Sequence, residues 1–232
     1  MFEAHIVKRR RDFTVDLRLR MSFPGCLALF GRSGSGKSTV LSCIAGIEQP
    51  DDGFVRMDDR LLFPPPLPLN QRPVGYLTQE PHLFPHLTVA SNVAFGLGHR
   101  PSCEETAWLH HIRDSLNLGD IWNASAARIS GGQARRVAVA RMLARRPPLV
   151  LLDEPFTGLD RQLVRELIEA LLTWKREIGF GMVVVDHQSE VLERLCSCVA
   201  IIDRGKIIQE GSWDAIRAQP ADPGLRQLLN PL

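Results

Sequence analysis

The fold is decided by one stretch near the N-terminus, Gly31-Arg32-Ser33-Gly34-Ser35-Gly36-Lys37-Ser38-Thr39, which has the form GxxxxGK[ST]. Its glycines let the backbone curl tightly, so that successive N–H groups point at phosphate oxygens. Lys37 supplies a charged donor for the β- and γ-phosphates, and the Ser38 hydroxyl suits Mg²⁺. The whole stretch therefore predicts a binding site for ATP or GTP, with Mg²⁺ as cofactor.

The sequence on either side of this phosphate loop agrees with the motif. Residues 27–30 form a short apolar run, as in a buried strand, and apolar residues then recur at helical spacing up to Gly46, a C-terminal cap. A chance glycine-rich turn would not stand in register between a strand and a helix. The phosphates are therefore expected at a helix N-terminus, where the dipole favours anions.

Composition sets the class of protein. The chain has 232 residues, 44% hydrophobic and 23% charged, as in soluble globular proteins. A net charge of +2 gives no strong bias toward nucleic acid. No apolar run approaches the ~18 residues that cross a bilayer. The basic cluster Lys8–Arg11 precedes no apolar stretch, so we interpret it as a solvated turn between two strands and not as part of a signal peptide.

The cysteines carry little functional signal. There are five, an odd number, and none has metal-ligand spacing. We expect free thiols in a reducing cytoplasm. His82 and His86 have helical metal spacing, but the prolines around them favour a loop.

Further along, residues 82–145 have a helical pattern, while both flanks alternate strand and helix. Ser102 and Glu105 form a capping-box pattern before an amphipathic helix. Another amphipathic helix is expected at 163–172, a buried strand at 182–185, and an edge hairpin at 199–208. Residues 63–68 are proline-rich and predict a rigid surface loop more than an SH3-type ligand. This order indicates a helical lobe inserted into an α/β core.

A second motif follows the lobe. The apolar run 149–152 ends in Asp153 and Glu154, which is the Walker B pattern. Asp153 is expected to hold Mg²⁺, and Glu154 to polarise the attacking water. Alone, this pattern is weak evidence for a nucleotide site, but downstream of a phosphate loop it is strong evidence.

The third motif is Ile129-Ser130-Gly131-Gly132-Gln133, which leads into a helix that stops at Pro147-Pro148. Ser-Gly-Gly also suits a plain helix N-cap. Together with the other motifs, however, it resembles the LSGGQ signature, and residues 3–216 resemble the ATP-binding subunits of ABC transporters. Ile129 stands where leucine is usual.

The resemblance implies the remaining site residues. Gln79 matches the Q-loop, which contacts Mg²⁺ or water; Asp160 matches the D-loop, with Gly158 in place of alanine; His187 matches the switch histidine that touches the γ-phosphate. An adenine-stacking aromatic is hard to find. Phe13 is the candidate, although it also fits a core strand residue.

The resemblance also implies the architecture and the partners. We expect an α/β P-loop NTPase core with an N-terminal antiparallel β subdomain and an inserted α-helical subdomain, the chain from 1 to 232 forming a single nucleotide-binding domain without a C-terminal regulatory domain. Family members form head-to-tail homodimers, with the signature, here Ser130, Gly131, Gly132 and Gln133, acting in trans. They drive transmembrane permease subunits at the cytoplasmic face of the inner membrane, as peripheral proteins, and indirectly serve a solute-binding protein. No nucleic-acid partner is expected.

The transported solute is suggested by resemblance alone. Residues 72–89 are similar to importers, and together with residues 28–34 they look most like molybdate-importer ATPases. Importers of thiamine, sulfate, iron and polyamines share much of the pattern. An ABC ATPase outside transport and a phosphate-loop kinase are alternatives, but the latter does not explain the signature or His187.

Overall fold

The computed structural model describes residues 1–221 and 223–229 and places ten strands in two sheets. The antiparallel sheet has the order β2-β1-β4-β5, and the larger sheet the order β10-β9-β3-β8-β7-β6. In the larger sheet β9, β3, β8, β7 and β6 pair in parallel, and β10 pairs antiparallel at the edge. The strands are β1 Phe2–Arg9, β2 Thr14–Met21, β3 Cys26–Phe30, β4 Asp52–Met57, β5 Arg60–Phe63, β6 Val74–Leu77, β7 Leu149–Asp153, β8 Gly181–Val185, β9 Cys198–Asp203 and β10 Lys206–Ser212.

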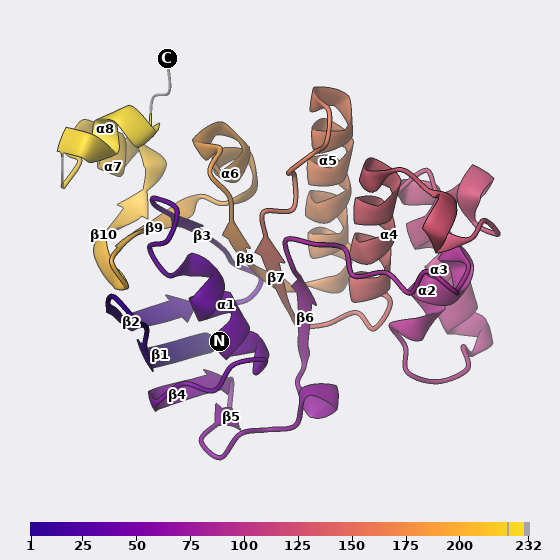
Figure 1. The fold of residues 1–232 in the computed structure, drawn as a ribbon, viewed down its shortest axis with the longest axis horizontal. Helices are drawn as coiled ribbons and strands as arrows, with labels where there is room; N and C mark the ends of the chain where they lie inside the picture. The colour runs from indigo at the N-terminus through magenta and orange to yellow at the C-terminus, as the bar shows by residue number, and fades with distance from the viewer. Residues whose placement is uncertain (222, 230–232) are drawn as a thin grey trace.

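Helices cover both faces of the parallel sheet (Figure 1). Helix α1 lies between the two sheets, and its apolar residues share a core with β1, β2 and β4. The opposite face of the parallel sheet packs against helices α4 to α8 in a second core. The helices are α1 Lys37–Ala45, α2 Val89–Phe95, α3 Cys103–Ser115, α4 Gly131–Leu143, α5 Arg161–Ile178, α6 Ser189–Leu195, α7 Trp213–Ala218 and α8 Pro223–Leu229.

Helices α2, α3 and α4 gather at one end of the molecule (Figure 1). They lie in the chain between β6 and β7, which are adjacent parallel strands. These helices therefore form a subdomain inserted into the connection between two neighbouring strands of the sheet. The expected fold, an α/β core with an antiparallel β subdomain and an inserted helical subdomain, is therefore confirmed.

Local predictions are also confirmed. Helix α1 ends at Gly46, whose φ of 83° is the left-handed conformation that glycine adopts freely. Ser102 and Glu105 form the capping box of α3. Strands β9 and β10 form the expected edge hairpin. Among the described residues, no helix combines the length and apolar character needed to cross a bilayer.

One expectation is wrong, and another holds only in part. Cys26 at the start of β3 and Cys196 after α6 form a disulfide, so only Cys43, Cys103 and Cys198 are free. Their separation of 170 residues in the chain hid this proximity, which the pairing of β3 with β9 creates. The basic cluster at 8–11 is the expected solvated turn only in part: Arg10 and Arg11 are exposed in the turn between β1 and β2, but Lys8 and Arg9 belong to β1, and Arg10 binds groups on and just beyond α1.

Candidate functional site

The phosphate loop joins β3 to α1 at the carboxyl edge of the parallel sheet. Gly34 and Gly36 have φ values of 77° and 105°, in the region that residues with a Cβ rarely adopt. A Cβ on Gly36 would also come within 2.9 Å of Val15. The loop thus needs glycine at position 34 for its conformation and at position 36 for both conformation and space. It leads directly into the N–H groups of the first turn of α1.

Lys37 is the first residue of α1, and its side chain folds back over the loop. Its Nζ donates to the carbonyls of Gly31 and Arg32, both at 2.9 Å. Burial lowers the pKa of Lys37, while the Glu154 and Asp153 carboxylates oppose this shift. The ammonium is therefore held at the centre of the loop, close enough to both carboxylates to feel their charge.

Asp153 ends β7 and is almost fully buried. Its Oδ1 accepts from the Ser38 hydroxyl at 3.2 Å, and its Oδ2 from the Tyr76 hydroxyl at 3.3 Å. Burial raises the pKa of Asp153, and it raises that of Tyr76 to about 12. A buried carboxylate beside a serine hydroxyl forms a pair of hard oxygen ligands.

Glu154, the next residue, meets the other two predicted catalytic residues. Its Oε2 accepts from Gln79 Nε2 at 3.1 Å and from the Thr157 hydroxyl at 3.3 Å, and its Oε1 lies 3.6 Å from His187 Nδ1. Its φ of 49° is left-handed, an uncommon conformation for glutamate. Its N–H donates to Val185 at 2.8 Å, which holds this turn against β8. Residues far apart in the sequence thus converge on one carboxylate.

Ser130 to Gln133 begin helix α4. Ser130 is the N-cap: its Oγ accepts from the Gln133 N–H at 3.3 Å, and its own N–H donates to Gln133 Oε1 at 2.8 Å. Neither residue lines the cavity above the phosphate loop, and Figure 1 shows α4 and α1 separated by β6. Within one chain, the structure does not bring the signature to the phosphate loop.

Asp160 is the N-cap of α5, where its Oδ1 accepts from the N–H groups of Gln162 and Leu163, both at 2.9 Å. A Cβ on Gly132 would lie 3.4 Å from Leu159. The start of α4 therefore packs against the predicted D-loop.

Above the phosphate loop lies a cavity of about 390 Å³, whose other wall is the turn between β1 and β2. Phe13 belongs to this turn and to neither strand, so it is not a strand residue, although its half-buried ring packs against the core around α1. Arg10 ties the turn to α1 through Thr39 Oγ1, at 2.7 Å from Nη2, and also reaches Glu48 at 2.6 Å. The cavity has room for the part of a nucleotide that extends beyond its phosphates.

Sequence reasoning missed three residues that support this site. Tyr76 and Thr157 donate to Asp153 and Glu154, and the buried Arg135 of α4 donates to the carbonyls of Thr78 and Gln79. Tyr76 is the only tyrosine of the chain and precedes Gln79 closely, which was a usable signal. The contact of Arg135 depends on tertiary packing, and nothing in the sequence indicates it.

Comparison with known proteins places this geometry in a family. Residues 15–157 match the ABC transporter family. The chain is 35% identical over 98% of its length to the molybdenum import ATP-binding protein ModC of Paramagnetospirillum magneticum, of which it covers 63%. It is 41% identical to the Fe(3+) ions import ATP-binding protein FbpC 2 of Haemophilus influenzae, over 79% of this chain and 52% of that protein. The chain thus spans roughly three-fifths or less of the length of these relatives.

Solved structures agree. The ATP-binding cassette MJ0796, in a dimeric post-hydrolysis state bound to ADP and Pi, superposes with a TM-score of 0.79 at 26% identity, covering 91% of this chain and 98% of that one. An ATP-binding subunit of an ABC transporter superposes with a TM-score of 0.84 at 24% identity, covering 98% of both chains. The chain belongs to the ABC transporter family, and its fold is that of the family's ATP-binding cassette.

Proposed function

We propose that this protein is the ATP-binding and ATP-hydrolysing subunit of an ABC importer. One observation carries the hydrolytic part: the neighbouring carboxylates Asp153 and Glu154 face different partners. Asp153 bonds to Ser38 of the phosphate loop, while Glu154 bonds to Gln79 and lies beside His187. With this arrangement Asp153 can bind a metal ion beside the phosphate loop, while Glu154 can act on the attacking water.

The residues present fit Mg²⁺. Ser38 Oγ and Asp153 Oδ1 are 3.2 Å apart, and both are hard oxygen donors of the kind that Mg²⁺ prefers. Burial disfavours the ionised form of Asp153, which a divalent cation beside it would stabilise. We propose Ser38, Asp153 and the amide oxygen of Gln79 as the residues that would hold it. When bound, the ion would neutralise phosphate charge.

The chain's own groups supply the rest. The N–H groups of residues 31–39 bind the phosphates, and Lys37 exchanges its bonds to the Gly31 and Arg32 carbonyls for phosphate oxygens. Glu154 accepts the proton of the attacking water, and Gln79 and Thr157 orient its carboxylate. His187 stands on the other side of that carboxylate, where it can touch the γ-phosphate. Phe13 is proposed to stack on the adenine.

A head-to-tail homodimer would complete the site. The signature does not line the cavity of its own chain, so we propose that Ser130 and the first turn of α4 serve the nucleotide of the partner. The positive end of α4 would favour closure while the γ-phosphate is present. The dimeric MJ0796 structure supports this arrangement by fold and by family.

For the transported solute we propose molybdate or tungstate first. Several relatives are named for molybdenum import, whereas others are named for Fe(3+) import. The subunit would act as a peripheral protein at the cytoplasmic face of the membrane, bound to permease subunits and indirectly serving a solute-binding protein. No described residue is assigned to the solute, because such subunits act on the permease.

The catalytic proposal is tested by measuring phosphate release from ATP with the purified chain and Mg²⁺. Wild-type protein should hydrolyse ATP, and Lys37→Ala should not. A wild-type chain that binds ATP but transfers its phosphate to another acceptor would favour a kinase.

The solute is tested separately by gene deletion. Deletion should lower molybdoenzyme activity at low external molybdate, and excess molybdate should restore it. A requirement for thiamine, sulfate or iron would instead change the solute and leave the ATPase proposal intact.

A further inference from the structure

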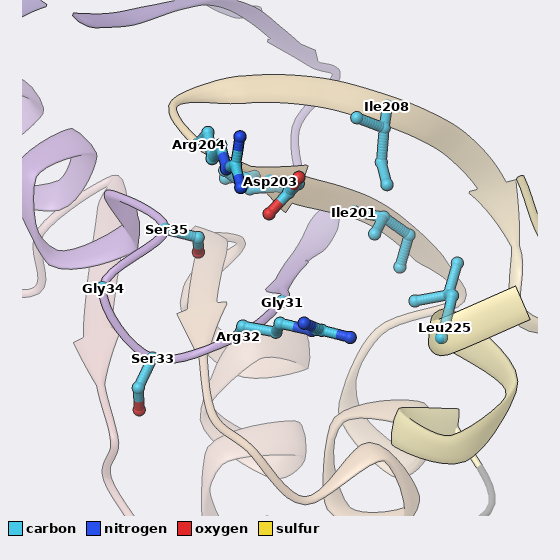
Figure 2. Close-up of a pocket in the computed structure, with 12 residues that line it drawn as sticks. Gly31, Arg32, Ser33, Gly34, Ser35, Ile201, Asp203, Arg204, Ile208 and Leu225 are labelled. Atoms are coloured by element: carbon cyan, nitrogen blue, oxygen red, sulfur yellow. The ribbon is translucent and has the colours of Figure 1, made fainter. Parts of the chain in front are cut away.

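A second cavity, of about 380 Å³, adjoins the phosphate loop on the side of the β9–β10 hairpin. Figure 2 shows its walls: the loop from Gly31 to Ser35, the β9–β10 turn, and Leu225 of α8 at one end. Its volume falls in the range of small-molecule sites, ~300–1,000 Å³. Neither Lys37 nor Glu154 lines it, so it is distinct from the cavity proposed for the nucleotide.

Two arginines line this cavity from opposite walls, Arg32 from the loop and Arg204 from the β9–β10 turn (Figure 2). Within residues 1–221 and 223–229, neither guanidinium has an ion pair or hydrogen bond. The third charged group is the carboxylate of Asp203, so the lining carries a net charge of about +1 at neutral pH. An unpaired guanidinium is a strong donor set for a carboxylate, sulfonate or phosphate group.

A buried hydroxyl points to the same chemistry. Ser35 is 4% exposed, and its Oγ has no hydrogen-bond partner. Figure 2 shows this side chain on the cavity side of the loop. A buried hydroxyl without a partner is unfavourable, and rotation of this side chain toward an acceptor oxygen in the cavity would satisfy it.

The opposite end of the cavity is apolar. Ile208 of β10 is 41% exposed there, an unusual position for a large aliphatic side chain, and Leu225 closes the end. We propose that this cavity, defined by Arg32, Ser35, Arg204, Ile208 and Leu225, binds a small organic anion with an apolar body. The anionic group lies with the arginines, and the apolar part lies on Ile208 and Leu225.

The site is coupled to nucleotide binding through a shared wall. Ser33 and Gly34 line both cavities, and the Gly205 N–H of the β9–β10 turn donates to the Ser35 carbonyl at 2.9 Å. An anion that holds Arg32 restrains the same segment that the phosphates must order, so the second ligand meets a smaller entropy loss. This coupling rests on the proposed function, whereas binding of the anion itself does not.

The test uses 1-naphthalenesulfonate as probe, titrated by calorimetry into the full chain. Arg204→Ala should raise the probe's Kd about ten-fold or more, because one charge-assisted contact is lost. Arg60→Ala is the matched control, an exposed arginine on β5 in the other sheet, and should bind like wild type. Ile208→Glu, which places a carboxylate at the cavity, should also weaken binding. Saturating probe should tighten the Kd for ATP roughly five-fold, and ATP that of the probe by the same factor.

Several results would overturn the proposal. They are no binding to wild type, equal binding by Arg204→Ala and Arg60→Ala, unchanged binding by Ile208→Glu, or full competition between the probe and ATP. An unchanged Kd for ATP in saturating probe would refute the coupling. If wild type fails to bind ATP at all, the proposed function fails, while the comparison of Arg204→Ala with Arg60→Ala still decides the anion site.

Discussion

Replacing Glu154 with glutamine separates binding from turnover most cleanly. The amide has the same shape, and its oxygen can still accept from Gln79 and Thr157, which lie 3.1 and 3.3 Å from Oε2 in the wild type. Two charge-assisted bonds become neutral ones, which should cost about 1 kcal/mol of stability. The affinity for ATP should change little, because the phosphate loop is untouched.

Turnover should fall much further. An amide cannot accept the proton of the attacking water, and loss of a general base costs ~10²–10⁴-fold in rate, or roughly 3–5 kcal/mol of barrier. Phosphate release under saturating Mg²⁺ and ATP measures this loss, and fluorescence titration measures affinity. Since hydrolysis would no longer reopen the dimer, Glu154→Gln should also elute as an ATP-dependent dimer in size-exclusion chromatography.

The matched control is Thr157→Val, which removes a donor to the same carboxylate but keeps the acid. Its turnover should stay within about ten-fold of wild type, the cost of one lost orienting hydrogen bond. A Glu154→Gln protein that binds ATP normally and hydrolyses it within ten-fold of the wild-type rate would refute the assignment of Glu154 as proton acceptor.

Four further outcomes are expected. Burial raises the pKa of Asp153, so its ionised form opposes folding, and stability is lost as pH rises from the unfolded pKa to the folded one. Without nucleotide at pH 7.5, Asp153→Asn should therefore unfold at a higher temperature than wild type. Scanning calorimetry should show this difference shrinking toward pH 4. Arg72→Ala should cost about 3 kcal/mol in urea unfolding, because the buried guanidinium donates to the carbonyls of Ile44, Leu62 and Leu67. Phe13→Ala should weaken ATP binding about ten-fold but leave inorganic tripolyphosphate unaffected, since only ATP has a base to stack. Ser130→Arg should be inactive alone yet regain activity when mixed with Lys37→Ala; failure of every mixture would count against a signature that acts in trans.

Local sequence was enough to predict the structure wherever a motif lies within, or at the end of, a single helix or strand. The phosphate loop, the end of β7 and the N-cap at Ser130 follow from glycine placement, apolar runs and capping residues that are neighbours in the chain. The edge hairpin was equally readable, since its turn and both strands are contiguous. In such segments the interactions that fix the backbone span only a few residues.

What the sequence could not predict depends on distant partners. Arg72 supports α1 from a loop before β6, and Arg135 holds the backbone of Gln79 from another helix. In the sequence, each arginine looks like an ordinary surface residue. Its hydrogen-bond acceptors are main-chain carbonyls, which every residue has, so no residue type in the sequence marks the contact. The Cys26–Cys196 disulfide was missed for a related reason. The chain has five cysteines, an odd number, and their spacing in the sequence does not show which strands pair.

The capping box at Ser130 has a consequence for the direction of any hydrogen bond made there. The Ser130 oxygen already accepts from the Gln133 N–H, and the Gln133 side-chain oxygen is taken by the Ser130 N–H. The Ser130 hydroxyl proton therefore stays available to be given away. The N–H groups of Gly131 and Gly132, in the first turn, have no acceptor within the helix. This end of α4 thus presents three N–H or O–H donors, those of Ser130, Gly131 and Gly132, against the single remaining lone pair of each capping-box oxygen, and it would favour an acceptor-rich group such as a phosphate.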